Sequence, residues 1–388
     1  MVLIDKPYAS PFLIDTLIKN QWPVVDTPSA RQVIKSEEIN WIPEKEARKQ
    51  ILDSPAEPLY SNSENALEWV EKNLKGTPFY KYAALFKDKY KFREALRNMY
   101  PGYRFLKAKL DGLEALDENQ LPYPFVIKPS IGFFSVGVYV VRNPAEWKET
   151  KHKLLKADFS NLFPENVLDT SYFILEEMIE GEEFAVDFYY DENGEPVILN
   201  ITKHLFASET DTSDRVYFTS KKIIEENEPV FKSFLAEMGK IIDIKNFPAH
   251  AELRIRPDGT VIPVEINPLR FGGWSTTAEI PGLGLGYNVY EAFFNRTKPD
   301  WDQIYKGKED KVYSIVLLDN NSGIPASKIK GFDYEKLLSD FENPVKIRKF
   351  DIRTSPVFGF LFTETSQNNM EELYRILQSD LKEYIFLL

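Results

Sequence analysis

The segment HAELRIRPDGTVIPVEINPLRFGG, residues 250–273, constrains the fold of this chain more than any other part of the sequence. Asp258 and Gly259 lie between two runs of mainly apolar residues, and Asp-Gly in that setting is the strongest short signal for a β-hairpin. A two-residue type I′ turn centred there predicts that Glu252 and Glu265 lie directly opposite each other. We expect them in a non-hydrogen-bonded pair, where side chains approach most closely.

The same register makes two further statements about this hairpin. Pro263 should lie opposite Arg254, at another non-hydrogen-bonded position, where the N–H that proline lacks costs nothing. Because side chains alternate between the two faces of a strand, Asn267 should share a face with Glu252 and Glu265. The hairpin is therefore predicted to gather two carboxylates and an amide on one face.

Two carboxylates that face each other repel, so the pair needs a proton, a cation or a basic neighbour. Glu252, Glu265 and Asn267 form an all-oxygen set that suits Mg²⁺, with Mn²⁺ as an alternative, and leave positions for water and phosphate. The competing interpretation is a solvent-exposed hairpin whose acids pair with Arg254 and Arg256, since matched charges are common on sheet surfaces.

A second informative segment is PFVIKPSIGFFSVGVYVV, residues 124–141, in which an apolar strand ends in Lys128 and a loop precedes another strand. The loop contains two serines and two glycines: Ser130, Gly132, Ser135 and Gly137. Such a loop exposes backbone N–H groups and hydroxyls to an anion, and the lysine supplies a positive charge. It is not a Walker loop, because Gly-Lys-Ser/Thr is absent. A plain glycine-containing β-turn is the alternative.

The third segment, YFILEEMIEGEEFAVD, residues 172–187, is an apolar strand that runs into acidic residues and restarts after a glycine. A buried strand has no structural need for Glu176 and Glu177 at its end, so we expect these residues to face a polar ligand. For Glu177, Glu180 and Glu182, the alternative is that they mark a strand end at solvent.

Composition excludes several classes of function. The net charge of −12 and the pI near 5.1 oppose binding to nucleic acid or to an anionic membrane surface. With no cysteine the chain has no thiolate nucleophile and no Cys-ligated zinc. With three histidines a His-rich metal site is not expected, and a hard cation held by oxygen is favoured. We find no signal peptide or membrane-spanning run in the sequence and expect a cytoplasmic protein.

The order of apolar and helical patterns predicts α/β and α+β architecture. The first hundred residues alternate short strands with helices, and a charged helix is expected over residues 87–99. A polar stretch over residues 208–220 reads as a loop above a site, followed by a helix from about Pro229 to Ile242. The last ninety residues hold strands, a helix at residues 334–341 and a terminal helix from Met370.

These three segments, in this order, resemble the ATP-grasp superfamily of carboxylate–amine and carboxylate–thiol ligases, over about residues 85–300. The resemblance implies the ATP-grasp fold, in which two α+β lobes clamp a nucleotide. It also implies a small N-terminal α/β domain at residues 1–103 and a C-terminal α+β domain at residues 298–388. The nucleotide-binding domain would span residues 104–297, with lobes at about 104–175 and 176–297.

The resemblance also assigns roles to residues. Lys89 and Lys128 would hold the phosphates of ATP, and the loop Gly132–Gly137, with Ser130 and Ser135, would close over them. Glu176 would meet the adenine amino group and Glu183 the ribose. The adenine edge would contact the backbone of Glu177, Met178 and Ile179, and the metal ligands would be Glu252, Glu265 and Asn267.

The start HAELRI and the end EIN…R-GG look most like the L-amino-acid ligase and carnosine synthase branch. There an arginine shortly after the metal asparagine steadies the acyl phosphate, and Arg270 is the candidate here. Asn-Pro-Leu-Arg carries one residue more than the Asn-x-Arg pattern of that branch. Lys203 and Arg215 are further catalytic candidates beside the polar loop, with an ordinary surface role as the alternative for Arg215.

The implied reaction is phosphorylation of a small-molecule carboxylate by ATP, followed by attack of an amine that releases phosphate. Two other interpretations stay open at this point: a nucleotide-binding sensor or scaffold without ligase activity, and a bicarbonate-using relative of carbamoyl-phosphate synthase or biotin carboxylase. A homodimer is compatible with either enzyme. The sequence also predicts that residues 132–137 and 208–220 become ordered on nucleotide binding.

Overall fold

The computed structural model describes residues 1–132, 137–157, 169–208 and 213–388. The chain forms two compact units whose segments alternate along the sequence. Unit 1 comprises residues 1–181, 189–196 and 234–270, and unit 2 comprises residues 182–188, 197–233 and 271–388. Strand β9 (Glu182–Tyr190) and helix α8 (Lys221–Ile242) are each divided between the units. The three-domain division expected from the sequence stays a prediction.

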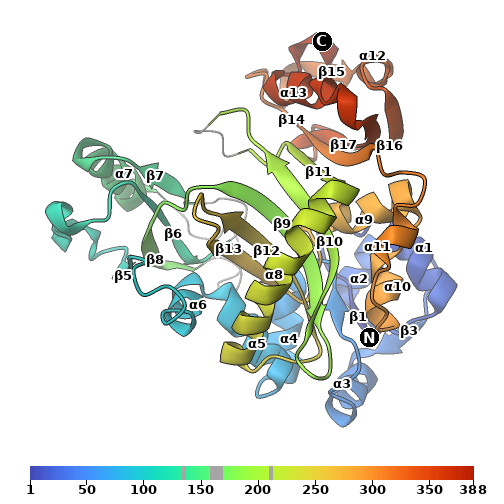
Figure 1. The fold of residues 1–388 in the computed structure, drawn as a ribbon, viewed down its shortest axis with the longest axis horizontal. Helices are drawn as coiled ribbons and strands as arrows, with labels where there is room; N and C mark the ends of the chain where they lie inside the picture. Colours follow the sequence, from blue (N-terminus) through green and yellow to red (C-terminus); the bar gives the residue numbers. More distant parts are fainter. Residues whose placement is uncertain (133–136, 158–168, 209–212) are drawn as a thin grey trace. The chain divides into compact units, whose positions relative to one another are not determined.

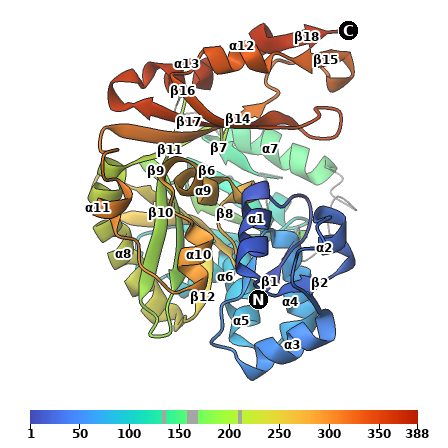
Figure 2. The same cartoon turned by 90° about the vertical axis from the view of Figure 1, so that its right-hand side faces the viewer.

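The N-terminal part of unit 1 is a parallel sheet of strand order β3-β2-β1-β4 with connecting helices, as expected for an α/β unit (Figure 2). Helix α1 begins where Ser10 caps it, since its hydroxyl accepts a hydrogen bond from the N–H of Leu13 at 3.0 Å and Pro11 follows. The elements are β1 (Val2–Leu3), α1 (Pro11–Asn20), β2 (Val24–Asp26), α2 (Pro28–Val33), β3 (Trp41–Pro43), α3 (Glu44–Asp53), β4 (Tyr60–Ser61) and α4 (Leu67–Leu74).

The range 87–99, predicted as one helix, contains only the last residue of α5 (Pro78–Lys87) and the whole of a second helix, α6 (Lys89–Ala95). Asp88 separates them, because it leaves the helical conformation and its carboxylate accepts a hydrogen bond from the N–H of Lys91 at 3.2 Å. The prediction was therefore wrong about where this helix begins and ends. The break sets Lys87 and Lys89 on either side of a helix cap.

The second sheet of unit 1 is antiparallel, of strand order β5-β8-β6-β7, and carries the segment 124–141 (Figure 1). Helix α7 covers it, and Trp147 of that helix is buried among Phe125, Val141 and Phe173 of the strands. These elements are β5 (Phe105–Lys109), β6 (Phe125–Ile131), β7 (Tyr139–Val141), α7 (Pro144–Lys156) and β8 (Asp169–Glu177). Unit 1 also contains the predicted hairpin, as β12 (Phe247–Ile255) and β13 (Val261–Pro268).

Unit 2 contains an antiparallel run of strands in the order β10-β11-β14-β17-β16. Helices α12 and α13 lie over one face of it, and Leu337, Leu373 and Ile376 are buried there against strand residues (Figure 2). Its elements include β10 (Pro196–Leu205), β11 (Val216–Ser220), α9 (Thr276–Ile280), α10 (Val289–Phe294), α11 (Trp301–Ile304), β14 (Lys311–Asp319), β15 (Ile329–Phe332), α12 (Tyr334–Ser339), β16 (Asn343–Lys349), β17 (Val357–Ser366), α13 (Glu371–Gln378) and β18 (Ile385–Leu387).

Two predictions for unit 2 are corrected by these elements. Residues 216–220 of the expected polar loop form β11, which pairs with β10 and β14, and Val216 is fully buried. Helix α8 begins at Lys221 rather than at Pro229, because the Ser220 hydroxyl accepts a hydrogen bond from the N–H of Ile223 at 3.3 Å and so caps it. Pro229 lies inside this helix. The β-forming sequence VYFTS is the signal for the strand.

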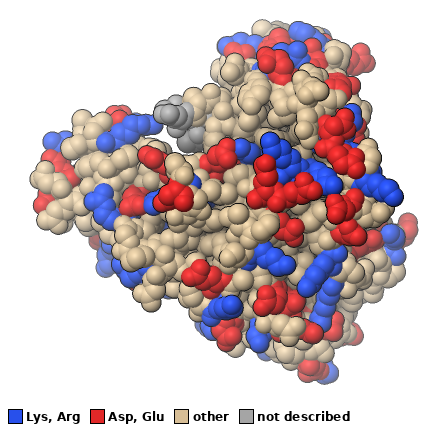
Figure 3. Space-filling view, viewed as in Figure 1, with Lys and Arg blue, Asp and Glu red and all other residues tan. Residues whose placement is uncertain are grey.

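The surface drawn in Figure 3 mixes Lys and Arg with Asp and Glu over the described elements. No broad basic patch is visible on that face of the described chain, in keeping with the net charge of −12. Within the part of the chain that the structure describes, none of the helices combines the length and the apolar character needed to span a bilayer.

Candidate active site

The hairpin β12–β13 brings the two predicted carboxylates together. Glu252 pairs directly with Glu265, and His250 pairs with Asn267, so the predicted opposition of the two acids is confirmed. Glu252 and Glu265 are partly exposed, whereas Asn267 is buried. A partly exposed set of carboxylate and amide oxygens fits Mg²⁺, a hard cation that retains water ligands.

The turn that produces this pairing differs from the predicted one. The N–H of Gly259 donates to the carbonyl of Arg256 at 2.9 Å, and the N–H of Arg256 donates to the carbonyl of Thr260 at 2.9 Å. The loop therefore has three residues, with Gly259 at φ +84°, rather than two in a type I′ turn. As a result Pro263 pairs with Leu253, and the prediction that it pairs with Arg254 was wrong.

A β-bulge between the loop and the two acids restores the predicted pairing of Glu252 with Glu265. The pairing shifts by one residue between Glu252 and Leu253, so that Val264 has no direct partner and Glu265 lies opposite Glu252. The longer loop and the bulge thus compensate each other. Arg93 of α6 reaches the bulge, since its guanidinium donates to the carbonyls of Pro263 and Val264, the latter at 3.5 Å.

Lys89, at the start of α6, joins the hairpin to the glycine loop. Its Nζ lies 3.3 Å from Oε1 of Glu265 and 3.1 Å from the carbonyl oxygen of Gly132. The preceding residue, Asp88, accepts a hydrogen bond from the Ser130 hydroxyl at 2.6 Å. Although burial acts to raise it, these hydrogen bonds keep the pKa of Asp88 below its ordinary value. The predicted phosphate-binding residues Lys89, Ser130 and Gly132 therefore lie together in unit 1.

Lys128 occupies a buried ion-pair network. Its Nζ lies 2.7 Å from Oε1 of Glu176, while Nε of Arg93 lies 2.6 Å from Oε2 of the same carboxylate. The hydroxyl of Tyr103 donates to that oxygen at 3.0 Å. Burial acts to raise the pKa of Glu176, but the charges of Arg93 and Lys128 prevail and hold it at about 2. The carboxylate is thus anchored to the protein, and its predicted contact with adenine stays a prediction.

The residues that follow Glu176 are also bonded within unit 1. The N–H groups of Glu177 and Met178 donate to the carbonyls of Arg104 and Pro124, at 3.0 and 3.1 Å. Arg254 donates to the carbonyl of Ile179, whose side chain is buried. The predicted contact between this backbone and an adenine edge stays a prediction.

Arg270 follows β13 and lies within reach of the metal-site charges. Its Nη2 lies 2.8 Å from Oε1 of Glu64, and its Nη1 is buried with no hydrogen-bond partner in the described chain. Burial acts to lower the pKa of Arg270, but Glu64 most strongly, and then Glu252 and Glu265, keep that pKa above its ordinary value. This guanidinium is therefore permanently charged and has one donor group left over.

Unit 2 holds the remaining candidates. Glu183 and His204 are both buried, with Nδ1 of His204 3.2 Å from Oε1 of Glu183, and Lys203 forms an ion pair with Glu182. Arg215 is almost completely buried and donates through Nη2 to Asp319 at 2.7 Å. It also donates to the carbonyls of Ile376 and Ser379. The surroundings of Arg215 favour a structural role over the predicted contact with substrate.

The remaining predicted site residues are two residues of the glycine loop and the metal ligands. Ser135 lies outside the described residues, and Gly137 is described with φ +72°. Within residues 1–132, 137–157, 169–208 and 213–388, no group of three or more His, Cys, Asp or Glu is placed to hold a metal. The predicted magnesium set contains two acids and an amide, so it is not of that kind and stays a prediction.

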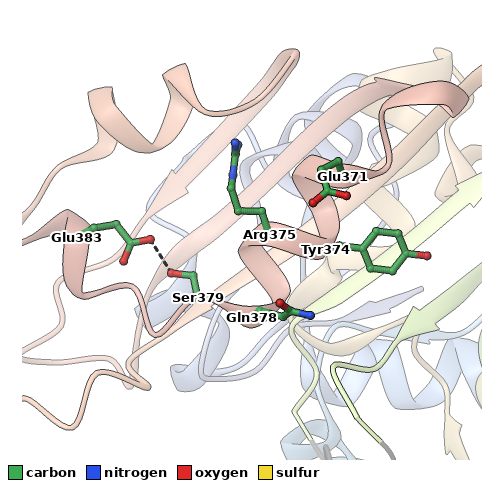
Figure 4. A pocket seen from close by; sticks show the side chains of 6 residues that line it. All are labelled: Glu371, Tyr374, Arg375, Gln378, Ser379 and Glu383. Atoms are coloured by element: carbon green, nitrogen blue, oxygen red, sulfur yellow. Dashed lines mark hydrogen bonds between the residues drawn. The ribbon is translucent and has the colours of Figure 1, made fainter.

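A surface hollow beside α13 is lined by residues 371–383, which are far in sequence from the predicted site residues. Six side chains line it, and Figure 4 shows Ser379 donating to Glu383 at 2.8 Å across one end. Arg375 of the same hollow donates to the carbonyl of Asp340. The lining residues are Glu371, Tyr374, Arg375, Gln378, Ser379 and Glu383. Most of these residues are exposed, and none of them is a predicted site residue.

Four residues of this site were missed by the sequence prediction: Glu64, Lys87, Arg93 and Tyr103. Lys87 forms a buried ion pair with Glu64, and its Nζ also lies 3.3 Å from the carbonyl oxygen of Gly132. Glu64 follows Ser61-Asn62-Ser63, a run that caps the next helical turn, and nothing in the sequence marks it as an ion-pair partner. Charged residues on helices usually face solvent, so the sequence alone does not mark Lys87 or Arg93 as buried site residues.

Comparison with known proteins agrees with the fold described above. Residues 121–278 match the ATP-grasp domain family. The chain therefore contains an ATP-grasp domain and has the ATP-grasp fold. The predicted fold class is confirmed, and the matched residues include Lys128, Glu176, Glu252, Glu265 and Arg270.

Solved structures resemble the whole chain. An L-amino acid ligase from Bacillus licheniformis superposes with a TM-score of 0.69 at 19% identity, covering 100% of this chain and 98% of that one. A biotin carboxylase from Campylobacter jejuni gives 0.62 at 11% identity, covering 100% and 91%. An N5-carboxyaminoimidazole ribonucleotide synthetase from Thermotoga maritima gives 0.61 at 14% identity, covering 100% and 99%. The comparison with curated proteins found no match.

Proposed function

We propose that this chain is an ATP-dependent ligase that joins a small-molecule carboxylate to an amine and releases ADP and phosphate. The observation that carries the proposal is the direct pairing of Glu252 with Glu265 in an ATP-grasp domain, with Lys89 3.3 Å from Glu265. The likeness to an L-amino acid ligase over the full chain supports an amino acid or small peptide as the carboxylate. ATP and Mg²⁺ are the proposed cosubstrate and metal.

The reaction divides into two steps. In the first, an oxygen of the substrate carboxylate attacks the γ-phosphorus of ATP, so that a carboxylate O–P bond forms and the P–O bond to ADP breaks. In the second, the amine nitrogen attacks the acyl carbon, the C–N bond forms and phosphate leaves with the C–O bond electrons. The amine proton passes to solvent. Little covalent work falls to the protein, so its part is positioning and charge neutralisation.

The residues of unit 1 suit that part. Glu252, Glu265 and Asn267 would hold Mg²⁺, which when bound neutralises phosphate charge. Lys89 would exchange its contacts with Glu265 and Gly132 for phosphate oxygens. Arg270 would donate from its unpartnered Nη1 to the developing oxyanion.

Lys128 has a different environment from Lys89. Its ammonium is buried against Glu176, and we propose that it contacts the nucleotide from this fixed position. The ion pair with this carboxylate limits the rotation of the lysine side chain. The role proposed for Glu183, at the ribose, follows the family pattern, and the role proposed for Lys203, at the γ-phosphate or substrate, follows from its place beside the polar loop.

A bicarbonate-using enzyme is the second candidate, because the fold also resembles a biotin carboxylase and a carboxyaminoimidazole ribonucleotide synthetase. In that reaction bicarbonate would replace the substrate carboxylate. A sensor without turnover is the third, since an ATP-grasp fold can bind nucleotide without ligation. The three differ in what triggers ADP formation.

One experiment separates them. Purified protein with ATP and Mg²⁺ is assayed for phosphate release against pairs of amino acids, against bicarbonate with an amine, and against neither, and products are weighed by mass spectrometry. A ligase gives ADP and a product lighter than its two substrates by one water. Turnover that needs bicarbonate supports the second candidate. Nucleotide-induced thermal stabilisation without turnover on any substrate supports the sensor and would refute the ligase.

A further inference from the structure

A buried carboxylate from the N-terminal part of the chain lies between two cations of the site. Glu64 belongs to a short helical turn, residues 64–66, directly after β4. It forms an ion pair with Lys87 on one side and with Arg270 on the other, the latter at 2.8 Å between Oε1 and Nη2. All three side chains are at most 12% exposed. A carboxylate buried this deeply is held by both partners.

This ion pair fixes which part of Arg270 remains available. Nη2 is committed to Glu64, whereas Nη1 is buried and has no partner in the described chain. A buried guanidinium N–H without an acceptor is costly, and such an exception calls for an explanation. An oxyanion of the substrate would satisfy it.

The backbone next to Arg270 is held by the same N-terminal segment. The N–H of Ser61 donates to the carbonyl of Leu269 at 2.6 Å, and the N–H of Leu269 donates to the carbonyl of Pro248 at 2.9 Å. The Ser61 hydroxyl lies 3.3 Å from the Leu269 carbonyl as well. Leu269 has φ +60°, a left-handed conformation that side chains with a Cβ rarely adopt and that its surroundings must enforce.

We infer that Glu64 is a positioning residue for Arg270: with Ser61 it fixes the guanidinium so that Nη1 points at the oxyanion of the reacting acyl group. The inference rests on the proposed function and adds to it a residue from outside the matched ATP-grasp domain. Glu64 does not contact substrate in this assignment, because Lys87 and Arg270 occupy its carboxylate. The pKa of Glu64, held at about 2 by Lys87 and Arg270 against the effect of burial, agrees with a permanent charge.

The kinetic test uses Glu64→Gln and Glu64→Asp, with Glu68→Gln as the control because Glu68 is an exposed acid four residues away. We expect Glu64→Gln to lower kcat about 100-fold, the effect of a misplaced catalytic group, and to leave KM for ATP within about twofold. Glu64→Asp, which keeps the charge, should recover part of kcat. Loss of ATP affinity equal to the loss of kcat would overturn the assignment, because it would indicate general disorder of the site.

A rescue experiment separates positioning from simple folding. Arg270→Ala should regain turnover when guanidinium ion is added at concentrations far below those that unfold the protein, because the Glu64 carboxylate can still bind that ion. The double variant Glu64→Gln/Arg270→Ala should not respond. Equal rescue in both backgrounds would show that Glu64 does not orient the guanidinium, and the assignment would fall.

The contact itself can be measured without substrate. In a double-mutant cycle of Glu64→Gln and Arg270→Gln, read by urea unfolding, the two effects on the unfolding equilibrium constant should be coupled by about tenfold. Additive effects would overturn the positioning role. Because this cycle needs no turnover, coupling in a protein that forms no ADP would refute the proposed ligase and leave the Glu64–Arg270 contact standing.

Discussion

The network around Glu176 allows a stability prediction whose size follows from the structure. Glu176→Gln removes the carboxylate that Lys128 and Arg93 share, and it leaves both cations buried. The pKa of Glu176 is about 2 instead of the ordinary 4.5, and each unit of pKa corresponds to about 1.4 kcal/mol, so the charged form contributes about 3 kcal/mol. Removal of one partner from a buried ion pair typically costs about 3 to 5 kcal/mol, which agrees.

The lowered pKa of Glu176 also gives the direction in which stability changes with pH. Because the folded-state pKa is below the unfolded-state value, the unfolded chain takes up the proton first as the pH falls. The stabilisation by Glu176 is therefore complete above pH 4.5 and is lost as the pH falls toward 2. The pKa of Glu64 is also about 2, so the stabilisation by the Glu64 carboxylate is lost over the same pH range. Glu176→Gln should flatten the acid dependence of the wild type without abolishing it.

Urea unfolding at neutral pH, and at several pH values between 4.5 and 2, measures both effects. The control is Glu149→Gln, whose pair with Lys153 at 2.7 Å is exposed and should leave the stability close to that of the wild type. The reasoning is refuted if Glu176→Gln is within about 1 kcal/mol of the wild type at neutral pH and loses stability with the same slope in acid.

Three further predictions test the site and its frame. Glu265→Gln should lower turnover about 100-fold and abolish the Mg²⁺-dependent part of the thermal shift that ATP produces, while the apo protein stays folded. Glu195→Gln, at an exposed acid, is the control and should change neither turnover nor the thermal shift. An unchanged shift and turnover in Glu265→Gln would contradict the metal assignment. In steady-state kinetics Lys128→Ala should raise KM for ATP about tenfold or more, whereas Arg270→Ala should mainly lower kcat; equal loss of ATP affinity in both would remove this division of roles. Gly181→Ala should destabilise the fold by more than about 1 kcal/mol in urea, since its φ is +117° and a Cβ would lie 2.0 Å from a carbonyl oxygen of β12; wild-type stability would show that the backbone there yields easily.

The hairpin shows how far local sequence reasoning reaches. The pairing of Glu252 with Glu265 was predicted correctly, although the turn and the partner of Pro263 were wrong. An Asp-Gly pair fits both a two-residue turn and a three-residue loop that ends in a left-handed glycine. The bulge at Val264 then compensates for the longer loop, and no residue type in the sequence VIPVE predicts that bulge. The prediction of the site survived because two one-residue differences cancelled.

The ion-pair partners lay beyond local reasoning. Glu64 and Arg270 are 206 residues apart, and Arg93 and Glu176 are 83 residues apart. Strand and helix periodicities tell which face a residue occupies, but they do not tell which distant charge will meet it. The ATP-grasp motifs predicted Lys128, Glu176 and Arg270 as site residues, whereas the ion pairs Lys128–Glu176 and Arg270–Glu64 became visible only with the fold.

The extra residue in Asn-Pro-Leu-Arg has a structural explanation. In a strand that continued past Asn267, side chains would alternate, and Arg270 would point away from the face that carries Asn267. Strand β13 instead ends at Pro268, and Leu269 adopts φ +60°, which interrupts the alternation before the arginine. The conformation costs about 1 kcal/mol for a residue with a Cβ, and the bonds from Ser61 and to Pro248 offset it. The longer spacing and the Ser61–Glu64 segment therefore belong together: the segment supplies the Ser61 bond that helps to hold Leu269 left-handed and the Glu64 carboxylate that accepts from Nη2 of Arg270.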